Sequence, residues 1–224
     1  MSFRVAFEGI DGSGKGTQAA RLRDALAGDG RRVDLLSFPR YSETFFGRAA
    51  GEFLNGRFGP ADAVDPFLVS LLFAGDRFES KAVIERADAA NDVLIFDRYV
   101  ASNIAHQAAK LPPDRRDELA AWVERIEYGI HKLPRPNLVI LLDLPADEAQ
   151  RRIARKRPRD YTDRAADLHE EDAAYLARVR EVYHELASRG ENWRVIDCLR
   201  DGEPRSAEEI GAEIAAIVRD GRER

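Results

Sequence analysis

The 224-residue sequence predicts one three-layer α/β domain, residues 1–224, with a five-stranded parallel sheet flanked by helices. Short apolar runs alternate with longer segments of helical period, a pattern typical of parallel sheets. Two of the runs, VLIF and LVILL, are apolar throughout, as expected for strands buried on both faces of a sheet. The length suits a single domain that needs neither a metal nor a disulfide to fold, and no repeat divides it.

The strands are expected at residues 3–7, 33–38, 93–96, 138–142 and 193–196. The helices are expected at residues 17–27, 65–86, 114–131, 167–188 and 206–219. The second helix has a strong start signal, because Asp65 before Pro66 is a good cap followed by a proline in the first turn. Residues 39–60 contain four glycines and are expected to be the least regular ordered region, and the tail after Asp220 is expected to fray.

Composition and charge exclude several classes of protein. The formal net charge of −5 argues against a nucleic-acid binder with a general basic surface. The single cysteine, Cys198, excludes a disulfide framework and suits a reducing compartment. No basic segment with a long apolar run follows the N-terminus, and the longest apolar stretch, 138–142, is too short to span a membrane. We therefore expect a cytoplasmic protein without nucleic-acid or membrane partners.

The strongest motif lies between the first expected strand and the first expected helix, where residues 7–18 read FEGIDGSGKGTQ. Gly9, four residues, Gly14 and Lys15 have the spacing of a phosphate-binding P-loop. Glycines let backbone amides turn toward phosphate oxygens, and the helix N-terminus adds donors and a partial positive charge. The alternative is an ordinary glycine-rich turn. The motif predicts that Lys15 bridges the β and γ phosphates, in an ATP site formed by Gly9, Ile10, Asp11, Gly12, Ser13, Gly14, Lys15, Gly16 and Thr17.

One position departs from the usual P-loop. The Ser or Thr that normally follows the lysine is replaced by Gly16, and Thr17 comes one residue later. One residue is a rotation of about 100° around a helix, which argues against direct Mg²⁺ ligation by a hydroxyl at the usual place. The form GKGT resembles adenylate kinases, and the chain has no Asn-Lys-x-Asp guanine motif. Both features favour a nucleotide kinase over a GTPase switch.

Two of the expected strands end in an aspartate, Asp97 and Asp143. Either could hold Mg²⁺ at the carboxyl edge of the sheet, as phosphoryl transfer requires. Asp97 is favoured, because Arg98 follows it and the pair could serve the metal and an acceptor phosphate together. The alternative for Asp97 and Arg98 is a surface salt bridge. For Asp143 we expect a cap on the following helix.

Several segments together resemble the thymidylate kinase family. DRYVASNIAHQ (97–107) resembles its Asp-Arg-Tyr/His motif, FPRY (38–41) and LLFAGDR (71–77) resemble its acceptor-side segments, and EGIDGSGK resembles its P-loop. The matches occur in the family's order and reach from Phe7 to about Tyr183. The resemblance implies a P-loop kinase fold, transfer of phosphate from ATP to dTMP with Mg²⁺, and a homodimer. Other acceptors such as dUMP or AMP, and a nucleotide-binding switch without turnover, remain the alternatives.

The resemblance also implies roles for single residues of the acceptor site. Phe73 and Arg77 are four apart on a helix and share a face; by resemblance Phe73 stacks on thymine and Arg77 donates to a base oxygen. The alternative is that Phe73 is a core residue and Arg77 a surface one. By resemblance the remaining acceptor residues are Asn103 at the base, Arg40 and Arg98 at the phosphate, and Tyr99 packing the acceptor. Asp11 would orient the metal or the acceptor, and His106 either lies near the sugar or is an ordinary surface histidine.

The last motif is basic, RRIARKRPR at residues 151–159. A run of this kind is often a solvated helix face. The P-loop contains no arginine, however, so another segment has to bring a guanidinium to the transferred phosphate. We therefore expect a mobile basic lid over about residues 151–165, with Arg155, Lys156, Arg157 and Arg159 as candidates and Arg155 and Arg157 as the catalytic choices. For Asp167 and Glu170, helix capping and a metal or acceptor role both remain open.

Overall fold

A five-stranded parallel sheet forms the centre of the computed structural model, which describes residues 1–60, 63–154 and 173–222. The spatial order of the strands is β2-β3-β1-β4-β5. Their bounds are β1 Phe3–Glu8, β2 Val33–Ser37, β3 Val93–Asp97, β4 Leu138–Asp143 and β5 Trp193–Asp197. All four pairings are parallel. The expected fold class and the five expected strands are confirmed.

The register of the sheet sets where a site can form. Phe7 of β1 lies opposite Asp97 of β3, and Glu8 of β1 lies opposite Leu141 of β4. The carboxyl ends of these parallel strands therefore share one edge. β1 has β3 on one side and β4 on the other, so the segment after β1 leaves the sheet at its topological switch point, where α/β folds bind ligands.

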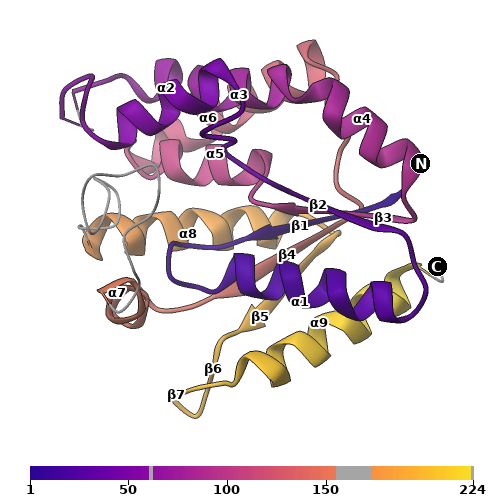
Figure 1. Ribbon diagram of the computed structural model, residues 1–224. Helices are drawn as coiled ribbons and strands as arrows, with labels where there is room; N and C mark the ends of the chain where they lie inside the picture. Colours follow the sequence, from indigo (N-terminus) through magenta and orange to yellow (C-terminus); the bar gives the residue numbers. More distant parts are fainter. Residues whose placement is uncertain (61–62, 155–172, 223–224) are drawn as a thin grey trace.

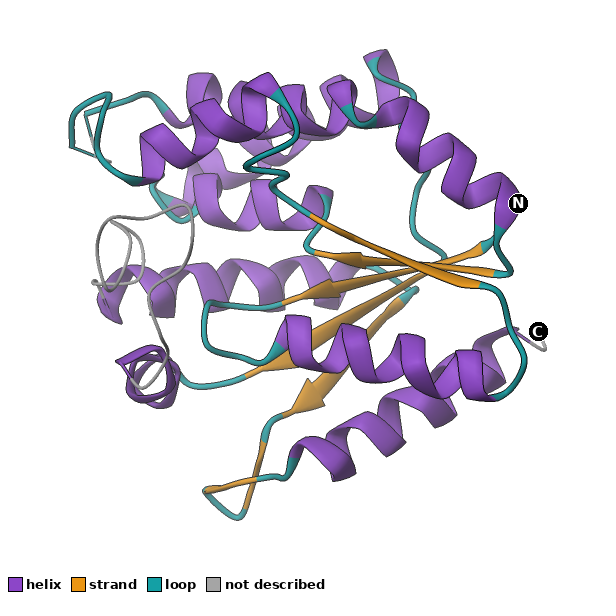
Figure 2. Ribbon diagram, viewed as in Figure 1, coloured by secondary structure: helices purple, strands orange, loops and turns teal. Residues whose placement is uncertain are grey.

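Helices cover both faces of the sheet (Figures 1 and 2). α1 and α9 pack together below it in the view of Figure 1, and α2 to α6 lie above it. α8 packs on β4 and β5. The helix bounds are α1 Lys15–Gly28, α2 Phe45–Leu54, α3 Pro66–Glu79, α4 Lys81–Ala90, α5 Val100–Ala108, α6 Pro113–Glu124, α7 Ala146–Ala154, α8 Ala173–Arg189 and α9 Ala207–Arg222.

Four helical regions differ from the sequence expectation. Residues 39–60 contain α2, which the Thr44 side chain caps by accepting from the Gly47 amide at 2.8 Å. The single helix expected at 65–86 is two helices, α3 and α4, which meet at the buried Ser80. The helix expected at 114–131 is α6 followed by a π-helical segment, η1, Arg125–Ile130. α5 was not expected at all.

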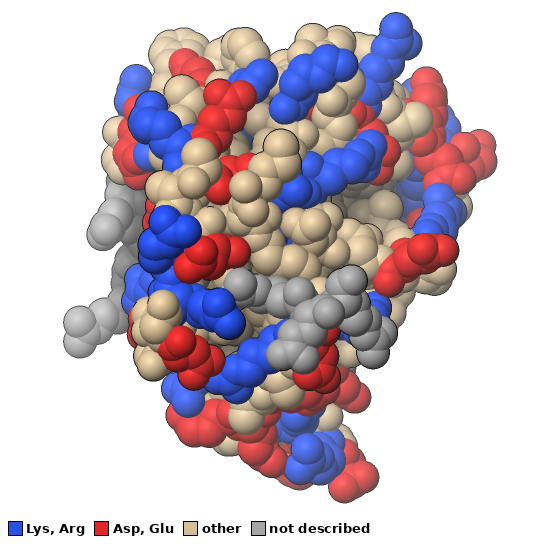
Figure 3. Space-filling view, turned by 90° about the vertical axis from the view of Figure 1, so that its right-hand side faces the viewer, with Lys and Arg blue, Asp and Glu red and all other residues tan. Residues whose placement is uncertain are grey.

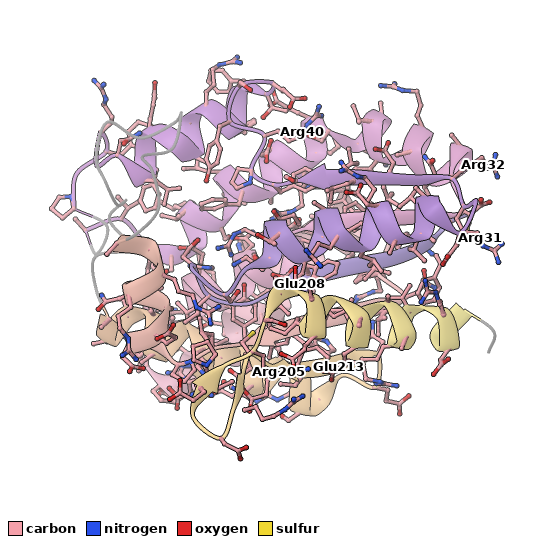
Figure 4. The ribbon with its side chains drawn as sticks, turned by 60° about the horizontal axis from the view of Figure 1, so that its bottom comes forward. Arg31, Arg32, Arg40, Arg205, Glu208 and Glu213 are labelled. Atoms are coloured by element: carbon pink, nitrogen blue, oxygen red, sulfur yellow. The ribbon has the colours of Figure 1, made fainter. Side chains whose placement is uncertain are left out.

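Charges of both signs lie on the surface (Figure 3), and a short hairpin precedes the C-terminal helix. On the face shown in Figure 3, acidic and basic side chains are interspersed, in agreement with the mixed charges of the sequence. β6 (Leu199–Arg200) and β7 (Glu203–Pro204) form a short hairpin after β5. Arg205 follows it and points toward Glu213 of α9 (Figure 4), with Nη2 2.5 Å from Oε2. None of the helices in the described ranges is both long and apolar enough to cross a membrane.

Candidate active site

The phosphate loop, residues 9–14, connects β1 to α1. Gly9 has a φ of 139° and Gly12 a φ of 83°, conformations that other residues rarely adopt. A Cβ on Gly9 would lie 2.6 Å from the carbonyl oxygen of Leu142, and one on Gly12 would lie 2.6 Å from that of Ala149. The loop is therefore held closely between β4 and α7. α1 begins after Gly14 without a side-chain cap, so its first amides remain available to an anion.

The side chain of Lys15 lies inside this loop. Its Nζ donates to the carbonyl oxygens of Gly9 and Ile10 at 2.9 and 2.8 Å. Burial, and next the neighbouring Arg98 guanidinium, lower the pKa of Lys15 to about 7, although nearby carboxylates act in the opposite direction. The ammonium group thus lies where phosphate oxygens of a nucleotide would offer it stronger partners than backbone carbonyls do.

Arg98 follows β3 directly and reaches the phosphate loop. Its Nη2 donates to Oδ1 of Asp11 at 2.6 Å. Its Nη1 lies 3.5 Å from the carbonyl oxygen of Gly9, 3.2 Å from Oγ of Ser102 and 3.2 Å from Nε2 of His106. The structure therefore brings an arginine that was expected at the acceptor phosphate into contact with the loop that was expected to hold the donor.

His106 belongs to this cluster. The hydroxyl of Tyr175 donates to the His106 carbonyl oxygen at 2.8 Å and lies 3.2 Å from His106 Nδ1. Because the single hydroxyl hydrogen serves the carbonyl, Nδ1 is the donor to Tyr175 and Nε2 is left to accept from Arg98. His106 is 9% exposed, so the alternative of an ordinary surface histidine is wrong.

Asp97 lies beside the first turn of α1. A Cβ added to Gly16 would come within 3.0 Å of Oδ2 of Asp97, so a side chain at residue 16 would crowd this carboxylate. In the described ranges, no group of three or more His, Cys, Asp or Glu side chains could hold a metal ion. Mg²⁺ usually keeps several waters and binds through one or two carboxylates plus substrate phosphates. The donor set of Asp97 and the nearby loop fits that pattern.

Arg40 lies in the loop between β2 and α2 (Figure 4). Its amide donates to Oδ2 of Asp76 at 3.0 Å, its Nη1 donates to Oγ of Ser80 at 3.3 Å, and its Nη2 pairs with Glu43. Thr44 Oγ1 donates to the other oxygen of Asp76 at 2.5 Å. Burial raises the pKa of Asp76 in spite of these bonds. Asp76 therefore fixes the loop that presents Arg40.

Arg77 is 2% exposed, so the alternative of a surface residue is wrong. It forms a two-point ion pair with the fully buried Glu127 of η1: Nε pairs with Oε2, and Nη2 lies 2.6 Å from Oε1. Asn103 Nδ2 donates to the same Oε1 at 2.9 Å and to the Ser70 carbonyl at 3.0 Å. Its Oδ1 has no partner in the part of the chain that the structure describes. Two residues of the expected base pocket, Arg77 and Asn103, therefore form one buried polar network with Glu127.

Gln107 was not expected in the site. It is completely buried, one helical turn after Asn103 on α5, and neither its Nε2 nor its Oε1 has a partner within the described residues. Buried polar atoms without partners are rare in folded proteins, so they call for an explanation such as a ligand. The spacing of four from Asn103 was the available signal. No sequence signal indicated Glu127, because its position depends on the π-helical turn of η1.

The two aromatic residues of the expected acceptor site lie in different surroundings. Tyr99 is 1% exposed, its ring stacks on Phe96 with centroids 4.2 Å apart, and its hydroxyl donates to the Pro134 carbonyl at 3.0 Å. It therefore packs beneath the site as a core residue. Phe73 is only partly buried, and it packs against a separate small cluster formed by Phe53, Leu54 and Val69.

Other expectations fall outside the site or outside the described ranges. The Asp143 carboxylate accepts from Arg180 at 2.6 and 2.7 Å and lies 2.9 Å from Nε2 of His184, both on α8, so the expected cap on α7 is wrong. Arg151 and Arg152 form ion pairs within α7. Six further expected residues lie outside the described residues: the lid candidates Arg155, Lys156, Arg157 and Arg159, and the two acids past the lid, Asp167 and Glu170.

Comparisons with known proteins identify the family. The model of the thymidylate kinase family matches residues 7–208. A thymidylate kinase of Mycobacterium tuberculosis is 38% identical over 200 residues, covering 89% of this chain and 92% of its own, and the human thymidylate kinase is 28% identical over 219 residues, covering 96% and 89%. The solved thymidylate kinase of Candida albicans has the same fold, with a TM-score of 0.71 at 23% identity over 99% of this chain and 92% of its own. This chain belongs to the thymidylate kinase family.

Proposed function

We propose that this chain transfers the γ-phosphate of ATP to dTMP and releases ADP and dTDP. One observation carries the proposal beyond family membership. Arg98, which the family resemblance assigns to the acceptor phosphate, has its Nη2 2.6 Å from Oδ1 of Asp11 in the phosphate loop. A single cation is thus shared between the two halves of the site, as a direct transfer between two bound phosphates requires.

The proposed mechanism relies on positioning and charge. The loop amides and Lys15 hold the β and γ phosphates of ATP, while Arg40 and Arg98 hold the acceptor phosphate as the nucleophile. Asp11 keeps the Arg98 guanidinium at the loop through their ion pair. A lid arginine, Arg155 or Arg157, completes the positive charge around the transferred group.

Mg²⁺ is part of the proposal. Asp97 and Asp11, whose carboxylates both act on the charge of Lys15, would hold the ion through its waters. When bound, Mg²⁺ supplies charge neutralisation at the phosphate oxygens. Gly16 keeps the space beside Asp97 open, because even one added carbon would approach this carboxylate to 3.0 Å.

The buried polar network of the acceptor pocket suits the edge of thymine, which offers carbonyl acceptors beside a ring N–H donor. Arg77 is held by Glu127 through Nε and Nη2, so Nη1 is the nitrogen that remains to donate to a base carbonyl. Asn103 Oδ1 and the Gln107 amide, which have no partner among the described residues, would provide an acceptor for the ring N–H. Phe73 would stack on the base, a contact worth about 1–3 kcal/mol.

A panel of nucleoside monophosphates tests the proposal. ADP release is measured with MgATP and each of dTMP, dUMP, dCMP and AMP, and kcat/KM should be highest for dTMP. A higher kcat/KM for AMP than for dTMP would show that AMP, and not dTMP, is the acceptor. Tight ATP binding without acceptor-dependent ADP release would instead indicate a nucleotide switch and contradict the proposal.

A homodimer is a further part of the proposal. Leu68, Leu71 and Phe78 share one face of α3 and are 61%, 37% and 52% exposed. A second copy that covered this stripe would also brace the helix that carries Phe73 and Arg77. Sedimentation should show a dimer that the double substitution L68E/F78E dissociates, whereas V195E, at another exposed apolar residue, should leave it intact. A cytoplasmic location remains a prediction from the sequence.

A further inference from the structure

The carboxyl group of Glu8 lies at the end of β1 and is completely buried. Its Oε1 accepts from the Tyr99 amide at 2.9 Å. Its Oε2 accepts from the Ser102 hydroxyl at 2.5 Å and from the Tyr183 hydroxyl at 3.1 Å. A buried carboxylate is costly unless donors satisfy it, and here donors from two separate parts of the chain converge on one group. The proposed mechanism gives Glu8 no contact with either substrate.

The first effect of Glu8 is on the backbone at Arg98. Arg98 has a φ of 66°, in the left-handed region that non-glycine residues seldom occupy. Hydrogen bonds hold the chain on both sides of this residue: the Arg98 amide donates to the Phe7 carbonyl at 3.0 Å, and the next amide, of Tyr99, donates to Glu8. Glu8 thus anchors the strained turn from which the Arg98 side chain departs.

The second effect is on the direction of a hydroxyl. Ser102 Oγ lies 2.5 Å from Glu8 and 3.2 Å from Nη1 of Arg98. Burial raises the pKa of Glu8, whereas the hydrogen bond from Ser102 and the charge of Arg98 lower it. The hydroxyl has one hydrogen, and Glu8 in its ionised form can only accept it, so the oxygen lone pairs of Ser102 then face the guanidinium. An amide at residue 8 would be able to donate to Ser102 and would remove this constraint.

We infer that Glu8 is a positioning residue, which holds the left-handed Arg98 turn and the Ser102 hydroxyl so that the guanidinium faces the acceptor phosphate beside the phosphate loop. The inference rests on the proposed function, in which Arg98 holds that phosphate. Tyr183 extends the same support to α8, since its hydroxyl also lies 3.0 Å from Ser102 Oγ.

The test is E8Q, which keeps the shape of the side chain and removes its charge. Steady-state kinetics give KM for dTMP and for ATP, and calorimetry gives the affinities for dTMP and for thymidine, which lacks the phosphate. We expect dTMP to bind at least about tenfold more weakly, because a charge-assisted contact is misaligned. The KM for ATP and the affinity for thymidine should stay within about twofold of wild type. Weakening of dTMP and thymidine by the same factor would overturn the inference, as would dTMP binding like that of wild type.

Two further variants keep the test decisive. D88N is a matched control, because Asp88 likewise accepts from a backbone amide and a hydroxyl, those of Ser2 at 3.2 and 2.6 Å, beside the other end of β1. It should change only thermal stability. If E8Q does not fold, S102A replaces it and should give a smaller loss for dTMP alone; an equal loss for thymidine would again overturn the inference. If the wild-type protein does not phosphorylate dTMP, the proposed function is wrong. The inference about Glu8 is tested separately, by the ratio of the dTMP affinities of the variant and the wild type.

Discussion

The donor side and the acceptor side of this site are built in opposite ways. The donor side is one continuous segment, residues 9–15, whose backbone and single lysine form the cradle. The acceptor side collects side chains from distant segments: Arg40 after β2, Arg77 on α3, Arg98 after β3, Gln107 on α5 and Glu127 on η1. A backbone cradle depends on chain geometry, whereas a side-chain pocket depends on buried ion pairs and amides. Substitutions on the two sides should therefore have different effects on catalysis, ligand affinity and stability.

The largest effect is expected on the donor side. In K15A the phosphate loop keeps its amides but loses the Lys15 ammonium group at its centre, so kcat should fall by about 10²–10³-fold. The affinity for dTMP should change little, because the acceptor network does not include Lys15. Coupled ADP release and calorimetric titration with dTMP measure the two quantities. A parallel loss of dTMP affinity would show that the two sides are not separable.

The acceptor side should couple binding to stability. R77L leaves the fully buried Glu127 carboxylate without its partner and should destabilise the protein by about 3–5 kcal/mol. The double substitution R77L/E127L removes both charges and should recover most of that loss. Both variants should bind dTMP about 10–100-fold more weakly, with ATP affinity unchanged.

Urea unfolding and calorimetry of these variants separate the alternatives. A double variant that regained dTMP affinity together with stability would mean that Arg77 only supports the fold. Equal losses of dTMP and ATP affinity in R77L would also count against a base-reading role.

The comparison also explains which parts of the molecule the sequence could predict. The donor loop was predicted residue by residue, because its residues are adjacent and its glycines are required by the φ values of Gly9 and Gly12. Two strands, β3 and β4, were predicted from runs that are apolar throughout, as buried parallel strands are; residues 93–96 are indeed completely buried. In these segments the local sequence pattern was enough to predict the backbone structure.

On the acceptor side, local pattern and tertiary packing disagree. The glycines of residues 39–60 indicated an irregular segment, yet Thr44 caps α2 there. The helical period of the sequence continues through residue 80, but the helix is interrupted at Ser80, whose hydroxyl accepts a hydrogen bond from Arg40. Asn103 and Arg77 were found through the family resemblance, whereas Glu127 depends on a π-helical turn that no period reveals. The same turn joins the base pocket to the end of α6.

A smaller effect, of opposite sign for stability and for binding, is expected at Gln107. Q107L removes a buried amide without partners among the described residues, so the free protein should gain about 1–3 kcal/mol of stability. The same change removes a polar partner for the base, so kcat/KM for dTMP should fall about tenfold, with KM for ATP unchanged. Thermal unfolding with and without dTMP measures both. A loss of stability in the absence of ligand would show that the amide already has partners in the free protein.

The smallest expected effect is the uptake of a proton when MgATP binds. The pKa of Lys15 is lowered to about 7, mainly by burial, whereas bound phosphates favour the charged form and raise it. At pH 8 the free protein therefore has mostly neutral Lys15, and MgATP binding should take up close to one proton; at pH 6 the uptake should be small. Because binding takes up a proton above pH 7, ATP affinity should fall as the pH rises from 7 to 9. Calorimetry in two buffers with different ionisation enthalpies measures the uptake, and equal uptake at both pH values would exclude Lys15 as its source. Since dTMP does not contact Lys15 in the proposed site, its binding should show no such dependence, which makes proton uptake a direct means of distinguishing the donor cradle from the acceptor pocket.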